Sequence, residues 1–295
     1  MKRAILEKAS PLVKALCLLS LMLVCSIVSL LIYNACIHDT STDALRLLQV
    51  LQSVCIFIVP CMVGAALWSQ QPVRWLRLDS LPSLASVGIA VSVVVCAVPF
   101  INLLSHINQQ ITLPESLNEI EQWMRQSEEQ AAALTEQFLC GKGYYDLFVN
   151  LLVMSVLPAF SEEIVFRGTL QPLFGEQRNR HCAVWCCAIL FSAIHMQFYG
   201  FLPRMLMGVG LGYMVVWSGS LWLPILAHAL NNALAVVTYF VCARGGHATE
   251  AADNFGTTDT LWVGVLSGVV TLSLLYALRR SLTMSKASSR RASGN

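Results

Sequence analysis

The segment LFVNLLVMSVLPAFSEEIVFRGTLQPLF, residues 147–174, combines a long apolar run with two adjacent glutamates, Glu162 and Glu163, and with Arg167. It is long enough to cross a bilayer as a helix, for which about 20 residues are needed. A charged residue at the centre of such a helix costs about 2.5–3.5 kcal/mol, and such residues usually mark a functional path inside the bundle. The segment therefore predicts a membrane helix that carries a functional site.

The composition extends this prediction to the whole chain. Of its 295 residues, 56% are hydrophobic and 12% charged, and the mean hydropathy is +0.63, well beyond ordinary soluble domains. Further spans are predicted at residues 15–33, 47–68, 81–104, 182–201, 205–217, 221–242 and 261–278. We therefore expect an all-α polytopic membrane protein with about eight transmembrane helices, surrounded by a lipid bilayer and without a nucleic-acid partner.

The charges of the loops alternate along the chain. Acidic residues dominate the first, third and seventh loops, whereas Lys and Arg gather before the first span, in the second and fourth loops and after the last span, at Lys2, Arg3, Lys8, Lys14, Arg74, Arg77, Arg178, Arg180, Arg279, Arg280, Lys286, Arg290 and Arg291. Basic residues accumulate on the cytoplasmic side. With eight spans, both termini are predicted to be cytoplasmic, in a membrane that we take to be a bacterial inner membrane.

The chain divides into five predicted regions. Residues 1–113 hold spans 1 to 3, and residues 114–142 form an acidic amphipathic helix outside the bilayer that begins at a proline. This helix is either a connector packed on the bundle or a lid over a substrate path. Residues 143–242 form the core with spans 4 to 7, residues 243–280 the last loop and span 8, and residues 281–295 a basic disordered tail.

The charged residues of the opening segment have different predicted roles. Glu163 and Arg167 are four residues apart, so they can pair along one face of the helix. Glu162 is rotated by about 100° from Glu163 on an α-helix and can point elsewhere. We interpret Glu162 as the reactive carboxylate, suited to a general base, and the other two residues as a supporting pair.

Two later spans carry histidines. Phe191 and His195 lie one helical turn apart on a shared face, and so do His228 and Asn232. Each pair has an ordinary structural explanation: His195 can bond a backbone carbonyl, and His228 with Asn232 can join neighbouring helices. Counted along the helices, however, Glu162, His195 and Asn232 lie at similar depths of about 18–20 Å. A carboxylate, two imidazoles and an amide at one level favour hydrolytic chemistry.

The chain resembles the CAAX prenyl endopeptidase and bacteriocin-processing (CPBP, or Abi) family of intramembrane proteases in three motifs, which consist of Glu162, Glu163 and Arg167, then Phe191 and His195, then His228 and Asn232. The resemblance covers about residues 147–242. It implies that Glu162 and His195 activate the attacking water and that His228 and Asn232 hold the oxyanion, with the remaining residues in support. It also implies a peptide or protein substrate.

Zinc is an alternative to a metal-free mechanism. Glu162, His195 and His228 would supply a carboxylate and two imidazoles, which suits catalytic zinc with an open position for water. No evident base would then remain, and the sequence lacks H-E-x-x-H. We therefore favour no cofactor, with zinc possible.

Two functions of other classes stay open at this stage. One is a non-catalytic membrane scaffold, or a peptide-binding protein of the bacteriocin-immunity type, which would keep the same residues. The other is a proton-coupled transporter, because buried Glu and His also build proton relays. The two halves of the chain show no internal repeat, which argues against a transporter.

Overall fold

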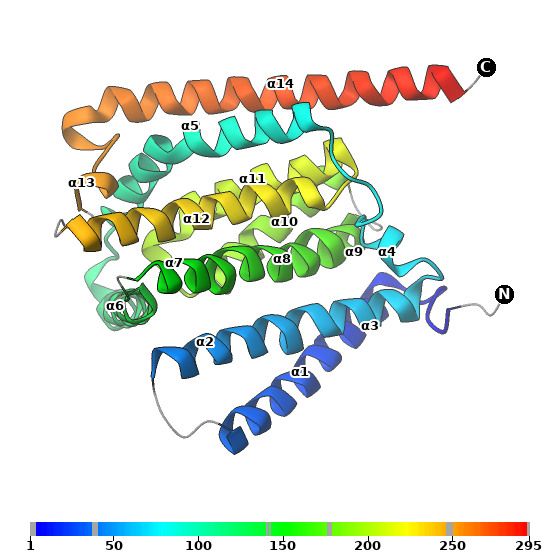
Figure 1. The fold of residues 1–295 in the computed structure, drawn as a ribbon, viewed down its shortest axis with the longest axis horizontal. Coiled ribbons are helices and arrows are strands. Elements are labelled where there is room, and N and C mark those ends of the chain that lie inside the picture. The colour runs from blue at the N-terminus through cyan, green and yellow to red at the C-terminus, as the bar shows by residue number, and fades with distance from the viewer. Residues whose placement is uncertain are drawn as a thin grey trace.

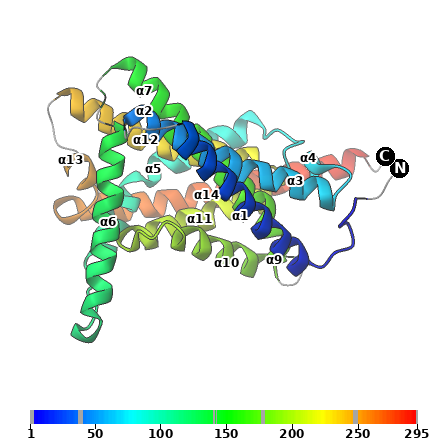
Figure 2. The same ribbon diagram turned by 90° about the horizontal axis from the view of Figure 1, so that it is seen from below.

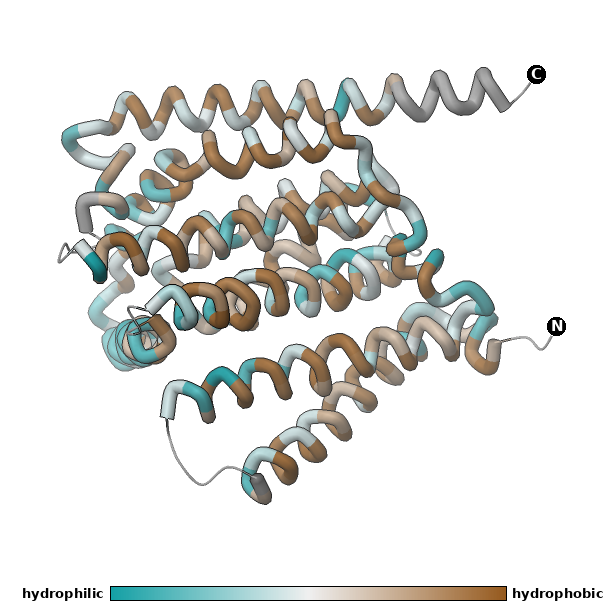
Figure 3. Tube along the Cα trace, viewed as in Figure 1, coloured by the Kyte–Doolittle hydropathy of each residue, from teal (hydrophilic) through white to brown (hydrophobic). Residues whose placement is uncertain are grey.

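The computed structural model of the chain describes residues 4–36, 41–139, 141, 143–175, 179–245 and 250–293 (Figure 1). Within these ranges every regular element is helical, without strands. Seven helical stretches are long and apolar enough to cross a membrane: Pro11–Ala35, Thr42–Trp68, Leu84–Gln109, Tyr144–Gly175, Phe198–Ser218, Trp222–Gly245 and Thr258–Met284. The protein is thus an all-helical, multi-pass membrane protein, with hydrophobic residues along its long helices (Figure 3).

The N-terminal part contains α1 (Pro11–Cys36), α2 (Thr42–Leu51), α3 (Val59–Trp68), α4 (Pro72–Trp75) and α5 (Leu84–Gln109). After α6 (Asn118–Leu139) follow α7 (Tyr144–Asn150), α8 (Leu157–Glu163), α9 (Gln171–Gly175), α10 (Arg180–Ala193), α11 (Phe201–Ser218), α12 (Trp222–Gly245), α13 (Glu250–Asp253) and α14 (Leu261–Ser293). Three π-helical stretches interrupt the long spans: η1 (Gln52–Ile58), η3 (Leu151–Val156) and η4 (Ile164–Leu170).

The loops collect at two opposite ends of the bundle. The start of α1, α4 and the end of α14 lie at one end, and α6 and α13 lie at the other (Figure 1). At the first end the Leu221 amide donates to the Arg77 carbonyl at 2.9 Å, which joins the loop before α5 to the loop before α12. At the second end the Asn102 amide donates to the Ala252 carbonyl at 2.9 Å. The basic loops and the acidic loops are therefore separated in space.

The fifth predicted span is shorter than the sequence indicated. It was expected over residues 182–201, but α10 has 14 residues and ends at Ala193, before His195. Met196 has a φ of 55°, in the left-handed region, which turns the chain out of the helix. The turn is stable because side chains bind its carbonyls: Arg204 donates to Gln197 at 3.3 Å. The sixth predicted span, 205–217, begins earlier than expected, as α11 and the short turn before it.

The acidic helix α6 lies across the other helices at one end of the bundle (Figures 1 and 2). It follows Pro114, as predicted, after the short 3-10 turn Glu115–Leu117. Its middle packs on the chain after α10: the Trp123 and Phe198 rings are 5.2 Å apart, and the Tyr199 amide donates to Glu128 at 3.3 Å. An acidic helix in this position covers the segment that carries His195.

The structure differs from the prediction of a disordered tail. Residues 281–293 continue α14 as a helix rather than leaving it at Ser281. Between Gly268 and Gly294 the sequence contains neither glycine nor proline, the two strongest helix breakers, while Ala, Lys, Arg, Met and Leu are good helix formers. The local preference therefore carries the helix beyond the apolar region.

Candidate functional site

The site is built around a buried ion pair. Arg167 donates to Glu163 Oε1 at 2.7 Å, and both side chains have no exposed surface. The predicted pairing of these two residues is therefore present. The guanidinium also donates to the Gly208 carbonyl of α11 at 3.1 Å, and its carbon lies 4.5 Å from the centre of the Phe191 ring. Burial of an unpaired charge would be costly, so these contacts hold Arg167 in place.

Local backbone features make this pair possible. The π-helical stretch η4 starts directly after Glu163, and the Thr169 hydroxyl donates to the Ile164 carbonyl at 2.9 Å. Such π turns inside α-helices occur often at functional sites. On the opposite helix, a Cβ at Gly208 would lie 3.2 Å from an Arg167 nitrogen. The glycine therefore lets the guanidinium reach the backbone of α11.

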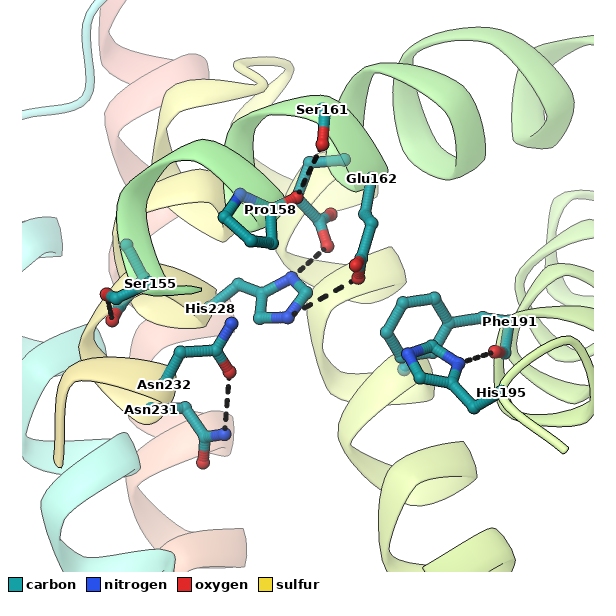
Figure 4. A network of polar contacts seen from close by, with 12 residues as sticks. Ser155, Pro158, Ser161, Glu162, Phe191, His195, His228, Asn231 and Asn232 are labelled. Atoms are coloured by element: carbon teal, nitrogen blue, oxygen red, sulfur yellow. Dashed lines mark hydrogen bonds and ion pairs between the residues drawn. The ribbon is translucent and has the colours of Figure 1, made fainter. Parts of the chain in front are cut away.

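His228 connects the two glutamates. Its Nδ1 lies 2.9 Å from Glu163 Oε1, and its Nε2 lies 3.8 Å from Glu162 Oε2 (Figure 4). A carboxylate only accepts, so Nδ1 must carry a proton and donate to Glu163. The ring is 3% exposed, whereas the Glu162 side chain is 17% exposed. Glu163 is thus shared by Arg167 and His228, and Glu162 is the more accessible carboxylate.

His195 lies outside this cluster, in the turn after α10. Its Nδ1 donates to the Phe191 carbonyl at 2.7 Å, the backbone bond that the structural interpretation predicts. Because Nδ1 holds the proton, Nε2 of the neutral ring has a lone pair available. Among the described residues, neither a hydrogen bond nor an ion pair joins His195 to Glu162. The Phe191 ring contacts both imidazoles, with centroids 5.0 Å from His195 and 5.8 Å from His228.

Asn232 lies one turn after His228 on α12 and completes the predicted set (Figure 4). Its Oδ1 accepts from Asn231 Nδ2 at 3.4 Å. An accepting Oδ1 fixes the orientation of the amide and leaves its Nδ2 protons as donors. Asn232 is therefore poised to donate, which is what an oxyanion requires.

Two polar residues near His195, which are Gln197 and Arg204, were not singled out from the sequence. Arg204 donates to both the carbonyl and the side-chain oxygen of Gln197, at 3.3 and 2.5 Å. It also lies within electrostatic range of Glu162 and of Glu128 on α6. The sixth span was predicted over residues 205–217, and Arg204 lies directly before it. The available signal was an arginine within a stretch that is apolar on both sides.

A zinc site does not fit the three residues proposed for it. The described residues contain no group of three or more His, Cys, Asp and Glu side chains that could hold a metal ion. Glu162 and His228 are close together, but neither a hydrogen bond nor an ion pair joins His195 to either of them among the described residues. We therefore route no chemical step through a metal.

Comparisons with known proteins match part of the chain. Residues 145–234 match the family model described as type II CAAX prenyl endopeptidase Rce1-like. The uncharacterized protein YpbD of Bacillus subtilis (strain 168) is 29% identical over 89 residues, which is 29% of this chain and 43% of that protein. An uncharacterized 24.3 kDa protein of Escherichia coli is 31% identical over 104 residues, 32% of this chain and 46% of that protein.

The matched stretches span less than half the length of either relative. No solved structure gives a significant match. The family model begins in α7 and ends in α12, so it includes all three predicted motifs and every side chain of the site described above. The chain therefore carries a domain of the CPBP family, of the Rce1-like type II CAAX prenyl endopeptidase kind, over residues 145–234.

Proposed function

We propose that this protein is an intramembrane endopeptidase that hydrolyses a peptide bond with Glu162 as the general base. The observation that carries the proposal is the convergence of two glutamates on opposite nitrogens of one buried histidine. Glu163 binds both His228 and Arg167 through Oε1, and Glu162 keeps one described ion-pair partner at 3.8 Å and partial exposure. A carboxylate with this freedom, inside a membrane bundle, suits proton transfer better than structural support.

In the proposed reaction, Glu162 takes a proton from a water molecule, and the water oxygen attacks the scissile carbonyl carbon. His195 assists from the other side of the substrate, since its Nε2 lone pair can accept a hydrogen bond from the same water. The proton on Glu162 then passes to the leaving nitrogen as the carbon–nitrogen bond breaks. The products are a new carboxyl group and a new amine.

The negative charge that develops on the carbonyl oxygen needs donors that are already in position. We assign this role to Nε2–H of His228, in its protonated form, and to the Asn232 amide. Glu163 supports the protonated ring through the 2.9 Å bond at Nδ1, and Arg167 in turn holds Glu163. Removing one donor of this kind typically lowers the rate by about 10²–10³.

The substrate class that we propose is a peptide or membrane-anchored protein, and the location is a cell membrane, with both termini in the cytoplasm. The start of α1 and the end of α14 lie at the same end of the bundle, which supports an even number of membrane crossings (Figure 1). In this topology the short helix α10 is the eighth crossing. The acidic α6 would then lie outside the bilayer on the other side. Labelling of cysteines placed in α6 and α4 from each side tests this topology.

A non-catalytic peptide-binding function is the second candidate, since the bond from His195 to the backbone is also what a structural histidine makes. Quantitative comparison of protein termini decides between the two. Cells that carry the wild type should accumulate cleaved termini that are missing from cells with His195→Ala or Glu162→Gln copies at equal protein level. Identical sets of termini would remove the enzyme from consideration and favour binding.

A further inference from the structure

A second feature of the fold is a pocket lined by other residues than the catalytic candidates. It has a volume of about 910 Å³ and is lined by α5, α10, α11, α12 and α14. This is at the upper end of the range for small-molecule sites, roughly 300–1,000 Å³. Asn231, the neighbour of Asn232, lines the pocket. The site residues themselves do not line it: Glu162, Glu163, Arg167, His195, His228 and Asn232. The pocket opens to the outer surface of the bundle, where Leu272 and Tyr276 are each 64% exposed.

The pocket has two chemically different ends. Arg180, His181 and Arg279 line the end next to the basic loops, and all three are exposed. Trp185, Tyr213 and Trp217 also line the pocket. Within the described ranges, neither Arg180 nor Arg279 has a carboxylate within ion-pair distance. Among the described residues, this end therefore offers two positive charges without a carboxylate partner, and Trp and Tyr side chains favour the membrane interface.

The remaining wall is mostly apolar, and two of its polar residues, Thr271 and Asn231, lie in the membrane-spanning part of the helices. Thr271 is 7% exposed, and its hydroxyl has no hydrogen-bond partner among the described residues. Asn231 donates to Asn232, the proposed oxyanion donor, at 3.4 Å. An occupant with an acceptor oxygen, such as an ester carbonyl, would satisfy the Thr271 hydroxyl. An occupant that contacts Asn231 would be connected to the catalytic site through the hydrogen bond from Asn231 to Asn232.

We propose that this pocket binds an anionic phospholipid, with its phosphate at Arg180 and Arg279 and an acyl chain along α11. The charge at one end and the apolar wall beyond it match the two parts of such a lipid. A zwitterionic lipid would fill the apolar wall equally well but would gain less at the arginines. The pocket is thus selective for the headgroup and holds the chain beside Asn231.

Quenching of tryptophan fluorescence tests this proposal without any substrate. The protein is reconstituted in vesicles that contain increasing fractions of acyl-brominated phosphatidylglycerol or acyl-brominated phosphatidylcholine. The signal of the pocket is the difference between the wild type and a Trp185→Phe, Trp217→Phe variant. We expect half-maximal quenching at a mole fraction about thirtyfold lower for phosphatidylglycerol, given about 1 kcal/mol for each of the two arginines.

The Arg180→Gln, Arg279→Gln double variant should lose this preference, and Arg74→Gln should keep it. Arg74 lies at the same end of the bundle, in α4, but does not line the pocket. Equal quenching by the two lipids in the wild type, or an unchanged preference in the double variant, would overturn the proposal.

The link to Asn232 rests on the proposed function and has its own measurement. Once a cleaved peptide is known, the cleavage rate should be higher in phosphatidylglycerol vesicles, and the double variant should lose that increase. If no peptide is cleaved at all, the proposed function fails, while the quenching result still decides the lipid site. Selective quenching without any effect of the lipid on the rate would overturn only the link.

Discussion

On one side of the site, Glu163, Arg167 and His228 form a cluster with no more than 3% exposure and bonds of 2.7 to 3.1 Å. On the other side, one bond to a backbone carbonyl orients His195, in a turn between two helices. The first side spans α8, α11 and α12 and has little freedom to move. The second side borders α6 and the turn before α11, so a substrate can approach there with less disruption.

This difference separates the supporting pair of Glu163 and Arg167 from the groups proposed to act on the substrate, and His228 links the two, with Nδ1 bonded to Glu163 and Nε2 facing Glu162. Glu162 belongs to the rigid helix but is the least restrained of the charged residues there, with one contact at 3.8 Å. The predictions below change one side at a time, starting with the largest expected effect.

Glu162→Gln should lower the cleavage rate by about 10²–10⁴, the range for loss of a general base. The protein should still fold, because the amide has nearly the same shape and the one ion-pair contact of Glu162 among the described residues is long. Rates in vesicles and thermal unfolding in detergent check both parts. Residual activity equal to the wild type would contradict the assignment of Glu162 as the base.

Glu163→Ala should destabilise the protein by about 3–5 kcal/mol, because it leaves Arg167 buried without its partner. The matched control is Glu121→Ala on α6, where Glu121 and Arg125 have the same i, i+4 spacing and the same 2.7 Å distance, but the side chains are 16% and 50% exposed rather than fully buried. Unfolding in mixed micelles should shift strongly for the first variant and not measurably for the second. Equal shifts in unfolding would show that burial does not make the pair of Glu163 and Arg167 more important for stability than the pair on α6.

Arg204→Gln should lower kcat about tenfold or more, because two hydrogen bonds from a charged group to Gln197 are lost. The turn that carries His195 would then be less ordered, while the Glu163 cluster stays intact. Arg204→Lys should retain part of the activity, since it can still bind the Gln197 carbonyl. If stability falls as much as in Glu163→Ala, Arg204 belongs to the structural support instead.

Trp123→Ala on α6 should have the smallest effect, about a threefold change in KM with an unchanged kcat. The Trp123 ring packs against Phe198, in the turn next to His195, at 5.2 Å. A change in KM alone favours the interpretation of α6 as a lid over the substrate path. An unchanged KM and kcat favour the interpretation as a connector.

Several features were predictable because they depend on neighbours in the sequence. The pairing of Glu163 with Arg167 needs only four residues of helix, and its burial follows from the apolar residues around it. The acidic helix after Pro114 was predicted from local spacing as well. The error in the tail was also local: charge and serine content suggested disorder, although the helix-forming residues carry α14 to Ser293.

The membrane class, the long helices and the family motifs were determined by the sequence itself, because burial in lipid demands continuous apolar helices with satisfied backbones. Tertiary structure decided which nitrogen of His228 faces which glutamate, since Glu163 and His228 are 65 residues apart. It also decided where α10 ends, because Arg204 binds a carbonyl seven residues earlier on another element. Contacts between side chains on different helices depend on how the helices pack. A local sequence pattern cannot specify them, because the two partners come together only when the chain folds.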